Sequence, residues 1–416
     1  MAKDTLKIQR FTLDNGLRVV HHHLPDSAMV ALNVLYGVGS RNETADLTGI
    51  AHLFEHLMFG GSENVDDFDG LLTAAGGVSN AWTSNDFTNF YLVAPAHNAE
   101  TLFYLESDRM LAPTISESSL QVQRSVVIEE FKQQCLNVPY GDLMHHLRRM
   151  VYSNHPYSWP VIGKDFSGLE KVTRSDMIEW WKNNYSPSNA VMTVVGNIDF
   201  NTTLNYAKKW FEEIPCRNNP TKAFIPVADL IENTTSTVHG NVPSTLINIA
   251  FLMDKYGTDE YLTADALTDV LASGKSSRFY QQITMNPHAP IVNAEAMITG
   301  AEDRGMLMLT ARFADEKIDL SEAKNYLIEA AKSVITTRIS EHELQRHKNR
   351  RRSAFILNNT SCVACAQALA EAEIHNMSPT EMLGRYERIK VESIENLAEK
   401  FFNESYHCTL YYRPLE

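Results

Sequence analysis

The residues best suited to chemistry lie in the sequence HLFEH, residues 52–56. Apolar residues on both sides and a Gly-Gly pair after it predict a short helix that ends at the glycines. Residues four apart share one face of a helix, so the imidazoles of His52 and His56 can reach one ion. Glu55 lies on the same side and can act as a general base on a water beside that ion. This inverted order of the commoner HExxH motif predicts metal-assisted hydrolysis.

An alternative for the bare motif is a pair of core histidines whose ring nitrogens bond to the backbone, with no metal. Under that alternative Glu55 would be an unpaired charge on an apolar helix, which is costly. Next to a divalent cation the same carboxylate is stabilised. The surrounding apolar sequence therefore favours the metal site.

A catalytic zinc ion usually has three protein ligands and one open position, so a further ligand must come from elsewhere. The segment QVQRSVVIEEFKQQ belongs to a predicted helix from about residue 116 to 135 and supplies the adjacent Glu129 and Glu130. Only one of them can face inward, and spacing alone does not choose between them. Two imidazoles and a carboxylate suit Zn²⁺, although manganese or cobalt could support the same geometry.

Strands and helices that could position this site follow one another through the first half of the chain. Period-two patterns predict strands, and longer amphipathic runs predict helices. The last helix of this half has Asn201 or Asp199 available as its N-cap. The predicted strands are FTLDNGLRVV, MVALNVLYGVGS, NFYLVAP and AVMTVVGNI, and the later helices are SDMIEWWKNNY and FNTTLNYAKKWFEEI.

The second half repeats this order of elements, with strands STLINIAFLMD, MLMLTARFAD and HCTLYYRP and the helix LTADALTDVLA. The repetition predicts a duplicated α+β unit. We expect domains at residues 1–217 and 227–416, joined by a linker at 218–226. The helix that corresponds to the motif helix offers Asp265 and Asp269 and no histidine, so the second copy should contribute a wall or a binding surface.

Composition limits the partners and the compartment. The chain has 416 residues, and 37 basic against 51 acidic residues give a formal net charge of -14. This charge argues against nucleic acid as the main partner. No apolar run is long enough for a membrane span, and the N-terminal residues alternate like strands rather than forming a signal peptide. Five scattered cysteines do not form a disulfide framework, so we expect a reducing, cytoplasmic location.

Two other groups of residues have side chains that could bind a metal, but their sequence context indicates a structural role. Cys362 and Cys365 form a CxxC with no second pair nearby, and they fit the buried side of an alanine-rich helix. Three consecutive histidines, residues 21–23, close a predicted strand, where neighbouring side chains point to opposite faces. Neither group is expected to bind a metal.

The order of several motifs resembles one peptidase family. HLFEHLMFGG is followed by GGVSNAWTSNDFTNFYLVAP, QRSVVIEEF, HPYSWPVIG and YSPSNAVMTVVGNID. The first half thus resembles the N-terminal domain of the insulinase, pitrilysin and mitochondrial processing peptidase family, and the second half resembles the family more weakly, through SSRFYQ. The resemblance implies a zinc endopeptidase of α+β fold, in which two homologous domains, each a mainly antiparallel sheet packed with helices, form half of a clam-like chamber.

The resemblance also identifies the third ligand. The family places its ligand glutamate six residues after an arginine, and six residues after Arg124 is Glu130. Glu129 then either supports a metal ligand without touching the ion or lies in solvent. Where the family usually has a supporting glutamate just before the arginine, this chain has Gln123, an amide that can orient a ligand but brings no charge.

A second departure concerns the substrate. Active relatives carry an arginine and a tyrosine seven apart that reach the substrate, whereas this chain has Thr284 and about Ile291 in those places. The family includes peptidases split between two chains, and this chain resembles the zinc-bearing one. We therefore expect a dimer, either a homodimer or a heterodimer whose other chain supplies the Arg/Tyr pair. The alternative is a non-catalytic, peptide-binding or scaffold subunit.

The resemblance finally points to a substrate site. Asn80, Ala81, Trp82 and Thr83 resemble the family's strand that pairs with the peptide backbone beside the zinc ion. We expect the substrate to add to this strand as a further β-strand.

Overall fold

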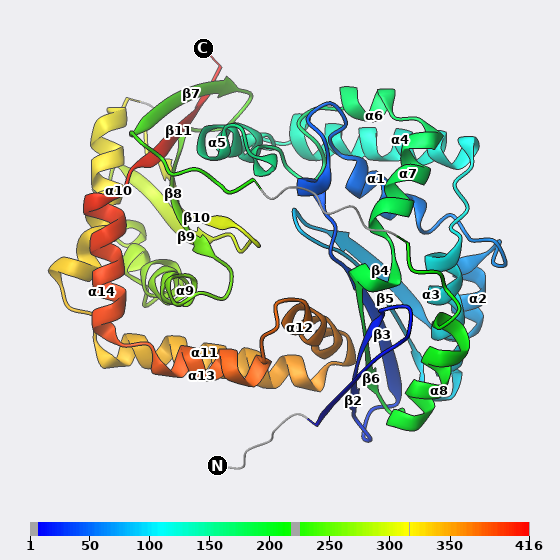
Figure 1. Ribbon diagram of the computed structural model, residues 1–416. Coiled ribbons are helices and arrows are strands. Elements are labelled where there is room, and N and C mark those ends of the chain that lie inside the picture. The colour runs from blue at the N-terminus through cyan, green and yellow to red at the C-terminus, as the bar shows by residue number, and fades with distance from the viewer. Residues whose placement is uncertain (1–6, 218–224, 316, 416) are drawn as a thin grey trace. The chain divides into compact units, whose positions relative to one another are not determined.

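The computed structural model describes residues 7–217, 225–315 and 317–415 (Figure 1). By their internal contacts these residues form two compact units, each discontinuous in sequence. Unit 1 comprises Met1–Phe131, Trp159–Phe224 and Ala354–Glu381, and unit 2 comprises Lys132–Ser158, Ile225–Ser353 and Met382–Glu416. Residues 218–224 of the predicted linker lie outside the described residues.

Unit 1 is built on a six-stranded sheet of order β1-β2-β6-β3-β5-β4. Strand β2 runs parallel to β6, and the other neighbours are antiparallel. Its strands are β1 (Ile8–Thr12), β2 (Arg18–His23), β3 (Met29–Tyr36), β4 (Val78–Thr83), β5 (Thr88–Pro95) and β6 (Ala190–Gly196). The predicted strands of the first half are thus present, and the two strands at the edges are β1 and β4.

Helices cover both faces of this sheet. One face packs on α1 (Ile50–Leu57), α3 (Ala99–Leu111), α7 (Arg174–Asn184) and α8 (Phe200–Phe211), through inward residues of β3 such as Leu32 and Val34. The other face packs on α12 (Cys362–Ile374), where Cys365 and Leu369 meet Ala31 and Leu35. Successive side chains of a strand point to opposite faces of the sheet, so alternate residues of β3 pack on the two sets of helices.

Unit 2 repeats the arrangement with a five-stranded sheet of order β7-β11-β8-β10-β9. Strand β7 is parallel to β11, and the remaining pairs are antiparallel, as in the series β2-β6-β3-β5-β4. The strands are β7 (Thr234–Gly240), β8 (Leu246–Lys255), β9 (Ile291–Ile298), β10 (Arg304–Phe313) and β11 (His407–Pro414). The repeated topology confirms the predicted duplicated α+β fold.

Each unit takes one of its covering helices from the other half of the sequence. In unit 2, α9 (Asp259–Ala272), α10 (Leu320–Thr336) and α14 (Val391–Glu399) pack on one face of the sheet, and α5 (Leu143–Tyr152) covers the other. Helix α5 comes from the first half of the sequence, whereas α12, which covers the sheet of unit 1, comes from the second. Each unit is therefore discontinuous in sequence, because each sheet has a second apolar face that needs a cover.

Shorter elements and connections complete both units. The other helices are α2 (Phe68–Ala74), α4 (Glu117–Phe131), α6 (Ser167–Lys171), α11 (Glu341–Thr360) and α13 (Pro379–Arg388). Short 3₁₀ turns occur at Ser40–Asn42, Ala96–Asn98, Pro156–Ser158 and Pro187–Asn189, and π-helical turns at Lys132–Leu136, Tyr280–Thr284 and Lys400–Glu404.

Local sequence explains several element boundaries. Asp199 caps α8, because its carboxylate accepts from the Thr202 amide at 3.0 Å. One of the two predicted caps is thus confirmed. Gly16 has a φ of 87° in the turn between β1 and β2, a conformation that glycine adopts without strain.

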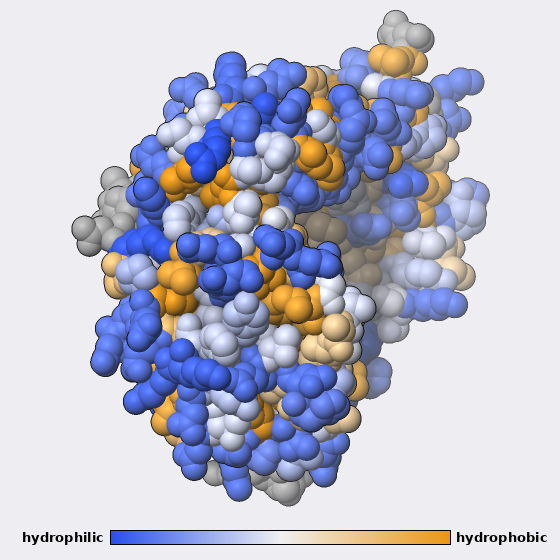
Figure 2. Space-filling model, turned by 90° about the vertical axis from the view of Figure 1, so that its right-hand side faces the viewer, coloured by the Kyte–Doolittle hydropathy of each residue, from blue (hydrophilic) through white to orange (hydrophobic). Residues whose placement is uncertain are grey.

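The face in Figure 2 is mainly hydrophilic, with hydrophobic residues scattered over it. Such scatter is normal for a water-exposed surface. Within the described ranges, no helix is both long and apolar enough to span a membrane.

Candidate metal centre

Helix α1 carries the HLFEH sequence, and its apolar side fixes the helix on the sheet of unit 1. Leu53, Phe54 and Leu57 are buried in the core. The ring of Phe54 lies 4.4 Å, centroid to centroid, from that of Tyr185, which follows α7. His52, Glu55 and His56 occupy the remaining side of the helix, as the spacing predicts.

A buried carboxylate anchors the start of this helix. The N-cap, Gly49, has no side chain that could accept a hydrogen bond. Glu43 takes this role, since its carboxylate accepts from the amides of Gly49 at 3.1 Å and Ala51 at 2.9 Å, and from the indole of Trp159 at 2.9 Å. Negative charge is favourable at a helix N-terminus. The role of Glu43 is not predictable from the sequence, because its only local signal is an acidic residue a few positions before a helix.

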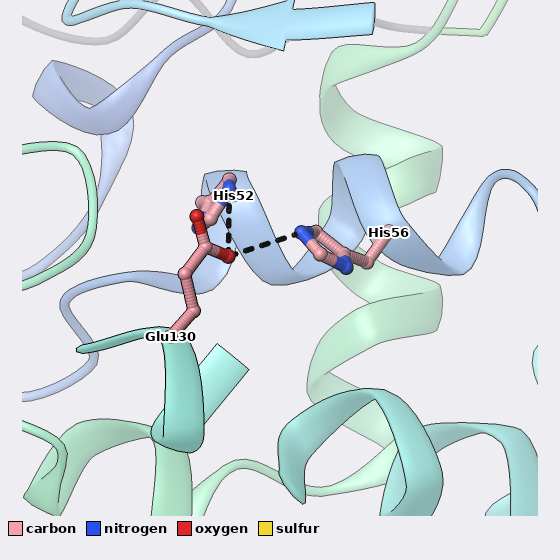
Figure 3. Close-up of side chains that lie close together, drawn as sticks. All are labelled: His52, His56 and Glu130. Atoms are coloured by element: carbon pink, nitrogen blue, oxygen red, sulfur yellow. Dashed lines mark ion pairs between the residues drawn. The ribbon is translucent and has the colours of Figure 1, made fainter. Parts of the chain in front are cut away.

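Two imidazoles and one carboxylate meet between α1 and α4 (Figure 3). Oε2 of Glu130 lies 3.8 Å from Nε2 of His52 and 3.6 Å from Nε2 of His56, and the possible ligand atoms all lie within 4.8 Å of one another. These separations exceed a hydrogen bond. Ligand atoms around a tetrahedral zinc ion lie roughly 3.4 Å apart, as bond lengths of about 2.0–2.1 Å require. The spacing and the donor set therefore fit a zinc ion.

The environment of His52 suits a neutral ligand. Burial lowers the pKa of His52 well below its usual range, with a smaller contribution from neighbouring His56, and the charge of Glu130 opposes the change. A histidine must be neutral to bind a metal ion. The ring is therefore in the ligand form at neutral pH.

Glu55 is almost buried, with 8% of its surface exposed. Its Oε2 accepts a hydrogen bond of 2.5 Å from the hydroxyl of Thr83, on β4. Burial raises the pKa of Glu55 to about 7; the bond from Thr83 acts against this rise, and the nearby charge of Glu130 adds to it. A carboxylate with such a pKa is suited to proton transfer near neutral pH.

The two adjacent glutamates of α4 differ in their surroundings. Glu130 belongs to the group that can share an ion, whereas the side chain of Glu129 is exposed. Gln123 lies two helical turns before Glu130 and is half-buried. Arg124 donates to the carbonyl oxygen of Val172 at 2.5 Å, which ties α4 to the end of α6. Arg124 thus has a structural contact that helps to fix the helix carrying Glu130.

Two family models match successive parts of the chain. A model described as "Insulinase (Peptidase family M16)" matches residues 18–165, and one described as "Peptidase M16 inactive domain" matches residues 171–351. The chain belongs to the insulinase family, peptidase family M16. All residues of the metal centre lie in the range matched by the first M16 model, and none lies in the range of the second.

M16 relatives match over nearly the whole chain. Zinc protease PqqE of Helicobacter pylori is 27% identical over 98% of this chain and 93% of its own length. An uncharacterized zinc protease of Bacillus subtilis, YmxG, is 25% identical over 97% and 98%. The mitochondrial-processing peptidase subunit beta of Saccharomyces cerevisiae is 21% identical over 92% and 86%. The chain is therefore similar to M16 proteins named zinc proteases and to one named as a subunit.

Solved M16 structures share the fold. A protease from Helicobacter pylori gives a TM-score of 0.91 at 25% identity and covers 98% of this chain and 100% of that chain. A peptidase M16 inactive domain from Pseudomonas fluorescens gives 0.87 at 15% identity, over 99% and 98%. The periplasmic protease PqqL from Escherichia coli gives 0.80 at 20% identity, and this chain spans 48% of its length. The M16 fold thus occurs both at the length of this chain and within a chain of about twice that length.

Strand β4 contains the four predicted substrate-binding residues at an edge of the sheet. Among the described strands it pairs with β5 alone. Ala81 packs against the core beside α1, whereas Trp82 packs against the cluster on the α12 face. Trp82 therefore directs its side chain away from Glu55, and Thr83 directs its hydroxyl toward it.

Unit 2 has ion pairs on the helix that corresponds to α1. Asp269 of α9 accepts from Nδ1 of His347 at 2.7 Å and from Arg350 at 2.6 Å. Asp265, one turn earlier, pairs with Arg351. In unit 2, as far as the structure describes it, no group of histidine, cysteine and carboxylate residues is arranged to share a metal ion. Cationic side chains of α11 thus neutralise the two carboxylates.

The two positions at which the family resemblance implies an Arg/Tyr pair lie in unit 2. Thr284 ends the π-helical turn Tyr280–Thr284 and is exposed, and Ile291 begins β9 and is buried. Ile291 has no side-chain hydrogen-bond donor, and Thr284 offers only a hydroxyl. Neither replaces a guanidinium or a phenol in kind.

Proposed function

We propose that this chain is a zinc-dependent endopeptidase that hydrolyses peptides or unfolded segments. The observation that carries the proposal is the convergence of two imidazoles and one carboxylate beside a second, buried carboxylate. Two nitrogen ligands, one oxygen ligand and an open position are typical of catalytic zinc.

Each residue of the metal centre has a distinct role in this proposal. His52, His56 and Glu130 would hold the zinc ion, which supplies Lewis-acid chemistry to the scissile carbonyl and to the attacking water. Glu55 takes a proton from that water and passes it to the nitrogen of the leaving amine. Because Glu55 is nearly buried, the proton it holds is kept from bulk water until the amine leaves.

The substrate would bind as a new strand on the free edge of β4. The amide of Ser84 donates to the carbonyl of Phe87, so the alternation of an antiparallel pair directs the backbone groups of Ala81 and Thr83 outward. The amide of Ala81 already donates to Oδ1 of Asn80 at 2.8 Å, a bond that an incoming peptide would replace. Backbone pairing of this kind gives affinity with little sequence preference.

We further propose that a partner chain completes the active site. Oxyanion donors typically stabilise the transition state by about 3 kcal/mol, so a missing pair would slow hydrolysis roughly a hundredfold or more. Thr284 and Ile291 offer no equivalent donors. A homodimer or a heterodimer is compatible with the lengths of the relatives, one of which is named a subunit.

The second candidate function is a non-catalytic, peptide-binding or scaffold subunit. The absent Arg/Tyr pair favours it, because lost oxyanion donors reduce rate more than affinity. A scaffold subunit has no need of a zinc site, so bound zinc would exclude the scaffold function. Turnover of a peptide substrate would exclude the peptide-binding function.

Cleavage of an unstructured peptide library by the purified chain tests the proposal. The measurement is made with and without a chelator and beside the Glu55→Gln variant. Chelator-sensitive, Glu55-dependent cleavage would establish an endopeptidase that works alone. Bound zinc without cleavage would point to the partner chain or to the peptide binder, and a chain that neither binds zinc nor cleaves would contradict the proposal.

A further inference from the structure

The hydroxyl of Thr83 holds the carboxylate that the proposed function uses as general base. The bond to Oε2 of Glu55 is 2.5 Å long, in the range of short hydrogen bonds to a charged acceptor. It joins two elements that are far apart in sequence, the motif helix α1 and the edge strand β4. Peptide-backbone pairing along β4 involves main-chain groups, so this side chain is free for another role.

Two features restrict the position of the Thr83 hydroxyl. Thr83 is β-branched, and such side chains are restricted at χ1. Its register partner on β5 is Thr88, which is fully buried and whose own hydroxyl donates to the carbonyl of Val38 at 2.9 Å. Thr83 therefore presents its hydroxyl to α1 from a strand whose neighbour is anchored in the core.

A glutamate without such a contact would not have a defined orientation. Its terminal torsion is broad and roughly two-fold, so its oxygens exchange places easily. A general base must lie within about 2.6–3.2 Å of the proton it removes. The hydrogen bond occupies Oε2 and leaves Oε1 of Glu55 to accept a proton.

We propose that Thr83 is a positioning residue, which orients the Glu55 carboxylate for proton transfer through the hydrogen bond between them. This inference rests on the proposed peptidase function. Thr83 does not itself touch the reacting atoms. It couples the edge strand that would receive the peptide to the base that would act on it.

Steady-state kinetics of three threonine variants test this role. Thr83→Val removes the hydroxyl at nearly constant volume. It should lower kcat roughly 10- to 100-fold, the usual effect of losing a hydrogen-bond partner that orients an active-site side chain. KM and zinc content should stay close to those of the wild type. Thr83→Ser keeps the hydroxyl and should recover most of kcat. Unchanged kcat in Thr83→Val, or a Thr83→Ser variant as impaired as Thr83→Val, would overturn the proposal.

Thr88→Val is the matched control. It makes the same exchange at the register partner and removes the buried bond to Val38. We expect it to lower the thermal midpoint at least as much as Thr83→Val while kcat stays near the wild-type value. If both variants lower kcat in proportion to their loss of stability, Thr83 has a structural role only, and the proposal fails.

Hydrogen exchange of the metal-free protein gives a readout that needs no activity. Thr83→Val and Glu55→Ala should each speed amide exchange in residues 78–88, and the double variant should exchange no faster than either single one, because both remove the same bond. If the purified wild type cleaves no peptide, this comparison alone decides whether Thr83 holds Glu55. The proposed function itself fails only if the wild type also binds no zinc. Unchanged exchange in Thr83→Val would overturn the proposal in either case.

Discussion

Burial of Glu55 predicts that its replacement stabilises the metal-free protein at alkaline pH. The ordinary pKa of a glutamate is 4.5, and that of Glu55 in the folded protein is about 7. The folded state therefore holds a proton that the unfolded state has released in this range, so its stability falls as pH rises. The raised pKa of Glu55 therefore lowers the unfolding free energy by roughly 1 kcal/mol at pH 5.5 and by roughly 3 kcal/mol at pH 8.

Glu55→Gln has no such cost, because an amide stays neutral. Metal-free Glu55→Gln should exceed the wild type in unfolding free energy by about 1 kcal/mol at pH 5.5 and by about 3 kcal/mol at pH 8. Zinc should narrow the gap, since a nearby cation stabilises the carboxylate. Urea unfolding followed by tryptophan fluorescence is a suitable assay, because all 5 tryptophans belong to unit 1.

Glu129→Gln is the matched control for this experiment. It makes the same chemical change on an exposed side chain, so we expect it to lack the large stabilisation at pH 8 that the buried site gives to Glu55→Gln. A Glu55→Gln advantage that is the same at both pH values would refute the reasoning. A wild type that is more stable than Glu55→Gln at pH 8 would refute it as well.

Two further substitutions test the anchors of the equivalent helices. Glu43→Ala removes the cap of α1 and should lower the unfolding free energy of unit 1 by about 1–2 kcal/mol. It should also weaken zinc binding. A zinc affinity equal to that of the wild type, measured by titration, would contradict this expectation. In unit 2, Asp269→Asn weakens the contacts with His347 and Arg350 and should lower the unfolding free energy by roughly 2 kcal/mol with zinc content unchanged. Urea unfolding and metal analysis check both parts, and a loss of zinc from Asp269→Asn would show that unit 2 is not independent of the metal centre.

The duplicated fold could be read from sequence because hydrophobic periodicity is local. Strands such as MVALNVLYGVGS and STLINIAFLMD are short, nearly continuous apolar runs that are buried on both faces, and their equal places in the two sheets follow from the order of the elements. The sequence does not show in this way that α5 covers the sheet of unit 2 or that α12 covers the sheet of unit 1. An amphipathic helix shows that it needs a partner, but its sequence does not show which sheet provides one.

The candidate site was predictable where residues share one helix and less so elsewhere. Spacing alone brings His52 and His56 together, whereas the choice of Glu130 over Glu129 came from family resemblance. The contacts of Glu43 and the bond from Thr83 to Glu55 depend on tertiary packing, so no local pattern announces them. The domain boundaries, the supporting role of Gln123, the cytoplasmic location and the nature of the partner stay predictions.

Zinc analysis of wild type, Glu130→Ala and Glu129→Ala tests the central claim most directly. After chelation and reloading, we predict about one zinc ion per chain in the wild type and in Glu129→Ala, because both keep the three ligands of a catalytic site. Glu130→Ala should retain little zinc, since only two imidazoles remain. A wild type that binds no zinc, or a Glu130→Ala variant that binds it as tightly as the wild type, would contradict the account.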